Sequence, residues 1–132
     1  MVSGRATLAG RSGAETRGDQ FARASLNMRI LFDQGTPAPL RRHLRPHPVD
    51  TTAERGWSTI SNGELLEYAE EEGYEVFPTT DQSLRYQQNL AGRRIGIVVL
   101  MATSWPRTKQ HIPAILAAVS NVIGGGYEEV PL

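Results

Sequence analysis

The run from Ile95 to Met101, Ile-Gly-Ile-Val-Val-Leu-Met, restricts the possible folds of this chain more than any other segment. It contains no polar side chain, whereas a strand with one solvent-exposed face alternates apolar and polar residues. Continuous apolarity is typical of a strand that is covered on both faces, and parallel sheets flanked by helices provide that cover. The run therefore predicts the central strand of a mainly parallel sheet.

Further segments with strand and helix patterns alternate around this run. Short apolar runs bounded by turn residues predict additional strands at 28–32, 47–52, 75–79 and, at an edge, 127–130. Apolar residues at helical spacing predict helices at 39–44, 61–72, 83–90 and 111–123. In the second of these helices, Glu70, Glu71 and Glu72 are expected on a solvated face. This alternation predicts right-handed βαβ crossovers and a three-layer α/β fold, but it leaves the strand order open.

Residues 1–27 differ from the rest of the chain. They are rich in glycine, alanine, serine and arginine, and they show no sustained apolar period, so we expect a disordered extension before a domain at 28–132. Four arginines and two acids give the extension a charge of +2, while ten basic and twelve acidic residues give the domain −2. A misassigned start, with Met28 as the true first residue, is the favoured explanation. A basic binding arm is the alternative, and the two acids argue against a transit peptide.

Composition excludes several classes of function. The chain has no cysteine, which rules out disulfide scaffolds, thiolate zinc sites and cysteine nucleophiles. The formal net charge is zero, so the charge of the whole molecule does not steer it toward nucleic acid. The three histidines lack metal-ligand spacing. Because no stretch approaches the ~20 apolar residues of a membrane span, we expect a cytoplasmic protein.

Three acids fall where a parallel sheet places its ligands. Asp33 follows the first predicted strand, Asp81 follows the third, and Glu64 lies in the first turn of the helix between them. Ligands of open parallel sheets bind outside the carboxyl ends of the strands. Clustered carboxylates repel one another unless they share a hard divalent cation, and Mg²⁺ or Mn²⁺ held in this way activates water and clamps a phosphate.

Each acid also has a structural interpretation. Glu64 completes a capping box with Ser61, Asp33 suits an Asx-turn or an N-cap, and Asp81 suits a cap of the helix that starts near 83. Arg85 lies one helical turn after Asp81, where it either neutralises a phosphate or pairs with that carboxylate. The sequence leaves these alternatives open.

Three motifs resemble those of the small bacterial PIN-like domains, which are related to PIN nucleases and are often proposed as toxins of toxin–antitoxin pairs. They are Met28-Arg-Ile-Leu-Phe-Asp-Gln-Gly-Thr-Pro, Ser61-Asn-Gly-Glu-Leu-Leu-Glu-Tyr-Ala and Phe77-Pro-Thr-Thr-Asp-Gln-Ser-Leu. The resemblance covers nearly all of 28–132 and none of the first 27 residues. It implies a three-layer PIN-like fold with a mainly parallel central sheet flanked by helices.

The resemblance also implies a site and an activity. Asp33, Glu64 and Asp81 match the three acids of the family, which would hold Mg²⁺ or Mn²⁺ for hydrolysis of RNA. Asn62 and Ser83 stand where relatives carry further aspartates, and they offer neutral oxygens instead.

In the same interpretation Thr80 and Arg85 would orient the phosphate. A cognate antitoxin and a homodimer are the implied partners besides RNA. The alternative is a catalytically degenerate PIN-like module that binds a partner protein or RNA. A phosphatase-like or nucleotide-binding domain that uses the same crevice is a third option.

Overall fold

The apolar run that dominates the sequence forms strand β4 (Gly96–Leu100), in which all five residues are buried. The structure is a computed structural model that describes residues 27–132. Four further strands join β4 in one sheet, and every pair of neighbours is parallel. They are β1 (Ile30–Phe32), β2 (Val49–Thr51), β3 (Val76–Thr79) and β5 (Gly126–Val130). The predicted α/β class with a parallel central sheet is confirmed.

The strands lie in the order β2-β1-β3-β4-β5. After β1 the chain adds β2 on one side of it. It then crosses over β1 and adds β3, β4 and β5 in turn on the other side. This is a common order of doubly wound parallel sheets, and the direction of winding reverses between β1 and β3. That reversal point is where such sheets open a crevice at their carboxyl ends.

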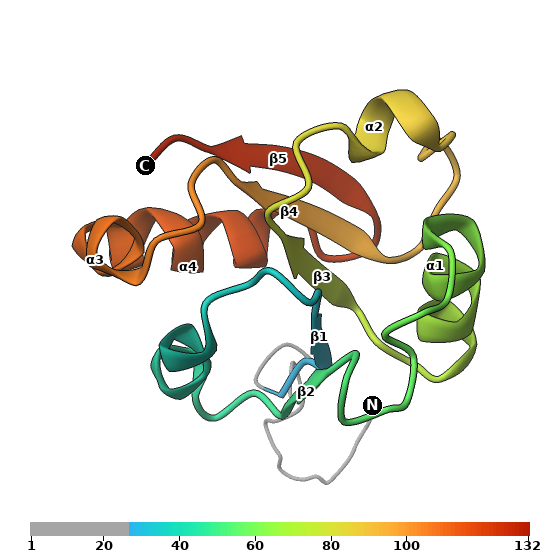
Figure 1. Cartoon of the computed structure of the whole chain (residues 1–132), viewed down its shortest axis with the longest axis horizontal. Helices are drawn as coiled ribbons and strands as arrows, with labels where there is room; N and C mark the ends of the chain where they lie inside the picture. The colour runs from blue at the N-terminus through green and yellow to red at the C-terminus, as the bar shows by residue number, and fades with distance from the viewer. Residues whose placement is uncertain (1–26) are drawn as a thin grey trace, which may run out of the picture.

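Side-chain alternation along the strands divides the core into two layers. Ile30, Phe32 and Val98 point to one face of the sheet, while Leu31 and Phe77 point to the other. Helices α1 and α2 lie on one side of the sheet, and α4 lies on the opposite side (Figure 1). The three layers expected from the alternating pattern are present.

The connecting helices follow the predicted positions with two short additions. They are the 3₁₀ turn η2 (Ala38–Leu44), α1 (Asn62–Glu71), α2 (Leu84–Gln87), α3 (Trp105–Thr108), the 3₁₀ turn η3 (Lys109–His111) and α4 (Ile112–Asn121). The apolar spacing of the sequence did not predict α3 or η3. Ser104 caps α3, because its Oγ accepts a hydrogen bond of 3.2 Å from the Arg107 N–H.

One crossover contradicts the uniform right-handedness expected from the sequence. The steps from β3 to β4 and from β4 to β5 move in the same direction along the sheet. The connection from β3 to β4 runs on the face covered by α1, where Leu84 is buried. The connection from β4 to β5 runs through α4 on the opposite face. Two crossovers in one direction on opposite faces have opposite hands. Sequence alternation indicates a crossover, but not the face on which its helix packs.

Glu70 is not on a solvated face as the sequence analysis expected. Its side chain is only 13% exposed, and Oε2 accepts hydrogen bonds from the backbone N–H groups of Arg94 (2.6 Å) and Ile95 (3.1 Å). Oε1 pairs with Arg93 at 3.2 Å. Burial works to raise the pKa of Glu70, but the two backbone donors and Arg93 outweigh it and lower that pKa below its ordinary value. Glu70 thereby ties α1 to the start of β4.

The extension predicted at residues 1–27 falls almost wholly outside the described part of the chain, so its disorder and origin stay predictions. Within residues 27–132, no helix has the length and apolarity needed to span a membrane.

Candidate carboxylate site

The candidate site lies at the carboxyl ends of β1 and β3, which are neighbours in the sheet. Asp33 follows β1 directly, and Thr79 is the last residue of β3. Because side chains alternate along a strand, Asp33 falls on the same face as Leu31, and Thr79 falls on the same face as Phe77. Both polar side chains therefore lie on the α1 face, at the point where the winding of the sheet reverses.

The buried hydroxyl of Thr79 connects the two predicted aspartates. It donates a hydrogen bond of 2.6 Å to Asp33 Oδ2 and accepts one of 3.0 Å from the Asp81 N–H. Thr79 is completely buried. A single side chain thus sets both the direction of the Asp33 carboxylate and the path of the backbone that leads into Asp81.

The Asp81 carboxylate is held by the starts of two helices. Oδ1 accepts from the Ser83 N–H at 3.0 Å and from the Ser83 hydroxyl at 2.7 Å. Oδ2 accepts from the Asn62 amide, in the first turn of α1, at 3.3 Å. Gln87 links these two partners of Asp81, because its side chain accepts a hydrogen bond from Asn62 at 3.2 Å and donates one to the Ser83 hydroxyl at 3.0 Å. The bonds from Ser83 to Asp81 form an Asx-turn. The sequence analysis expected Asp81 to cap α2, but the N-cap position is occupied by Ser83.

The loops after β1 and β3 pack against each other beside Asp33. A Cβ added to Gly35 would lie 2.4 Å from Thr80 Oγ1, so the close approach requires glycine unless Thr80 moves. The Thr36 hydroxyl donates to the Pro78 carbonyl at 3.0 Å. Asp33 Oδ1 accepts from the Gln34 N–H at 2.8 Å. Thr80, predicted to orient a phosphate, therefore lies beside Gly35 at the carboxyl ends of β1 and β3.

Glu64 is the predicted acid that the structure does not bring to the others. It is exposed, and its Oε1 lies 3.5 Å from the Ser61 hydroxyl. The residue of this helical turn that contacts Asp81 is Asn62. Because residues two apart on a helix point to different sides, Glu64 does not face Asp81 as well. The capping-box alternative is not formed either, because the Ser61 side chain makes no hydrogen bond to a backbone N–H of α1.

Arg85 pairs with an acid other than the one considered from sequence. Its Nη1 lies 3.5 Å from Glu129 Oε2 on β5. The guanidinium lies 4.7 Å from the centre of the Tyr86 ring and 5.8 Å from that of Tyr127. Burial and a hydrogen bond to Glu129 raise the pKa of Tyr127 to about 12. Arg85 thus belongs to an aromatic cluster at the edge of the sheet, and it pairs with Glu129 rather than with Asp81, the pairing that the sequence left open.

The chemistry of the cluster is that of oxygen donors. A carboxylate offers about four acceptor positions, of which Asp33 uses two and Asp81 three in the bonds described above. Asn62 donates its amide to Asp81, so its carbonyl oxygen still has acceptor capacity. Neutral and anionic oxygens suit a hard divalent cation. Across residues 27–132, however, no group of three or more histidine, aspartate and glutamate side chains is placed to hold a metal, so the three-acid ligand set stays a prediction.

Thr79 and Gln87 belong to this network but were not predicted. The signal for Thr79 was a polar residue at the end of an apolar strand, directly before Thr80 and Asp81. A threonine in that place is buried, so its hydroxyl needs a partner. Gln87 gave no comparable signal, because its role depends on where α1 and α2 meet.

Comparison with known proteins adds no assignment. No family model matches the sequence, and neither a curated protein nor a solved structure matches the chain. The PIN-like resemblance therefore stays a prediction that rests on the motifs quoted above.

Proposed function

We propose that the crevice of Asp33 and Asp81 binds Mg²⁺ or Mn²⁺ and hydrolyses phosphodiesters, with RNA as the substrate. The observation that carries this proposal is the pair of aspartates from neighbouring parallel strands, both organised by the hydroxyl of Thr79. The pair lies at the reversal point of the sheet, the usual ligand position in doubly wound folds.

In this proposal Asp33 and Asp81 are the principal metal ligands. Asn62 and Ser83 hold Asp81 in place and offer further neutral oxygens. Glu64 joins the ligand set only after it rotates away from Ser61. The bound cation would supply an activated water and a positive charge for the scissile phosphate.

The position of Thr80 also supports its proposed role in orienting the phosphate. Its hydroxyl lies close to Gly35, where a phosphate oxygen could accept from it. Arg85 acts on a phosphate in this proposal only if it leaves Glu129. The cognate antitoxin and the homodimer rest on the PIN-like resemblance alone.

RNA cleavage with and without Mn²⁺ tests the proposal. We expect metal-dependent cleavage by the parent, loss of cleavage in Asp33→Asn and Asp81→Asn, and full cleavage in the control Glu71→Gln, whose side chain is exposed and outside the crevice. Thermal unfolding of each variant shows that loss of activity is not loss of fold. Equal cleavage by the parent and Asp33→Asn would refute the proposal.

A second candidate is a module that binds a protein or RNA without catalysis. The observation in its favour is that Asp81 already accepts three hydrogen bonds from Ser83 and Asn62, as expected of a purely structural carboxylate. A cation that binds only the folded state must raise the melting temperature. If millimolar Mn²⁺ leaves the melting temperature of the parent unchanged, the binding module is favoured over the nuclease.

A further inference from the structure

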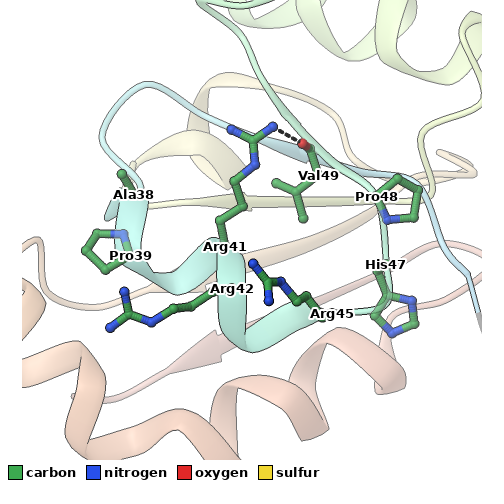
Figure 2. Close-up of a pocket in the computed structure, with 8 residues that line it drawn as sticks. All are labelled: Ala38, Pro39, Arg41, Arg42, Arg45, His47, Pro48 and Val49. Carbon is green, nitrogen blue, oxygen red and sulfur yellow. Dashed lines mark hydrogen bonds between the residues drawn. The ribbon is translucent and has the colours of Figure 1, made fainter.

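A basic hollow lies on the other side of the molecule, between η2 and the start of β2. Its volume is about 430 Å³, and none of the residues that line it is acidic. Four of them are basic, namely Arg41, Arg42, Arg45 and His47, and Pro39 and Pro48 form part of its apolar wall (Figure 2). This concentration of positive charge contrasts with the net charge of zero for the whole chain.

The local fold explains why the arginines gather at the surface. Leu40 and Leu44 are the buried residues of η2, and they pack into the core layer shared with α4. Arg41, Arg42 and Arg45 are consequently exposed. The apolar pattern of η2 thus leaves three arginines at the surface around one hollow.

Arg41 forms a fixed wall of this hollow. Its guanidinium makes two hydrogen bonds to Glu54, at 2.8 and 3.0 Å, and a third to the Val49 carbonyl. Such a bidentate arrangement holds the planar group in one orientation. Figure 2 shows Arg41 turned toward Val49.

The charges of the hollow suit a dianion. Arg41, Arg42 and Arg45 together with Glu54 leave two positive charges. Within residues 27–132, neither Arg42 nor Arg45 has a carboxylate at ion-pair distance. A phosphomonoester carries about −1.5 to −2 at pH 7, whereas a phosphodiester of a nucleic-acid backbone carries a single negative charge.

His47 also lines the hollow. Its Nδ1 accepts a hydrogen bond of 3.1 Å from the Met28 N–H. In a neutral imidazole the proton then resides on Nε2, which becomes a hydrogen-bond donor. Guanidinium groups and an imidazole N–H are common partners of phosphate oxygens.

We propose that this hollow binds a phosphomonoester, either a small phosphorylated molecule or the 5′-phosphate end of an RNA. The volume of about 430 Å³ lies in the usual range of ligand pockets, so it leaves room for the organic part of the ligand beside the prolines. The hollow and the carboxylate crevice lie on opposite faces of the sheet. The proposal therefore does not depend on metal binding or nuclease activity.

Calorimetric titration with inorganic phosphate, uridine 5′-monophosphate and uridine tests this site, at fixed ionic strength and with EDTA present. We expect the monophosphate to bind and uridine not to bind. The double variant Arg42→Gln/Arg45→Gln should weaken monophosphate binding at least about ten-fold, which corresponds to about 1.4 kcal/mol. The control Arg94→Gln/Lys109→Gln removes the same charge from exposed positions outside the hollow and should bind like the parent. Asp33→Asn should also bind like the parent.

A short RNA with and without a 5′-phosphate distinguishes the two sources of the ligand. If the 5′-phosphate tightens RNA binding by the parent but not by Arg42→Gln/Arg45→Gln, and the phosphorylated RNA binds more tightly than the free monophosphate, the hollow is assigned to RNA ends. If the 5′-phosphate does not tighten RNA binding while the free monophosphate binds, the hollow is assigned to a small molecule. Uridine binding as tightly as its monophosphate would overturn the proposal. So would equal weakening in the control double variant, because that result shows general charge attraction. Unchanged melting temperatures without ligand exclude unfolding as the cause.

Discussion

Replacement of Thr79 by valine tests whether one hydroxyl organises the carboxylate site. Valine keeps the branched shape in a completely buried position, but it removes the donor to Asp33 and the acceptor for the Asp81 N–H. A hydrogen bond to a charged group contributes about 2 kcal/mol and a neutral one about 1 kcal/mol. We therefore expect Thr79→Val to lower the free energy of unfolding by about 3 kcal/mol.

The matched control is Thr79→Ser, which keeps the hydroxyl and removes one buried methyl group. That loss should cost about 1 kcal/mol. For a domain of this size, the two substitutions correspond to falls in melting temperature of about 12 °C and about 4 °C. Urea unfolding followed by tryptophan fluorescence measures both free energies.

The relative stability of the two variants tests whether the Thr79 hydroxyl holds the two aspartates. If Thr79→Val is as stable as Thr79→Ser, or more stable, the hydroxyl does not hold Asp33 and Asp81 as described. The reasoning about a shared organising residue is then refuted, whatever the activity of the protein.

Three further predictions concern stability elsewhere in the fold. The pKa of Glu70 is lowered from 4.5, so its contribution to stability is present above about pH 4.5 and is lost as the pH falls. In urea unfolding between about pH 3 and 6, the free energy of unfolding should therefore depend less on pH in Glu70→Gln than in the parent, whereas Glu71→Gln should behave like the parent. The pKa of Tyr127 is raised from 10.0 to about 12, so the free energy of unfolding should fall from pH 10 to about pH 12 in the parent, but not in Tyr127→Phe. Gly96→Ala should lower the free energy of unfolding by about 2 kcal/mol, because the added Cβ would lie 2.1 Å from the Val122 carbonyl oxygen; an unchanged midpoint in urea would contradict this packing.

The order of elements was predictable because apolar periodicity differs between strands and helices. Continuous apolarity from Ile95 to Met101 is enough to indicate a strand covered on both sides. The hand of the last crossover was not predictable in the same way. It depends on the face against which Ile115 and Val119 pack, and the helical pattern of α4 would suit either face.

The candidate site was predictable where it depends on strand ends and less so where it depends on contacts between helices. Asp33 and Asp81 both follow strands, and the adjacency of β1 and β3 brings them to one end of the sheet. Glu64 was grouped with them because it lies in the first turn of the helix between the two strands. The sequence does not show that Asn62 is the residue of that turn which faces Asp81. Glu129 could become the partner of Arg85 only through the position of β5.

The central claim, a divalent cation in the crevice of Asp33 and Asp81, is tested most directly by NMR with Mn²⁺. The bound paramagnetic ion broadens amide signals of nearby residues. We predict selective broadening at substoichiometric Mn²⁺ for residues 33–35 and 79–83, with reversal by excess Mg²⁺ and loss in Asp33→Asn. Broadening that is absent, or that is spread evenly over the exposed acids of the described chain, would contradict the account.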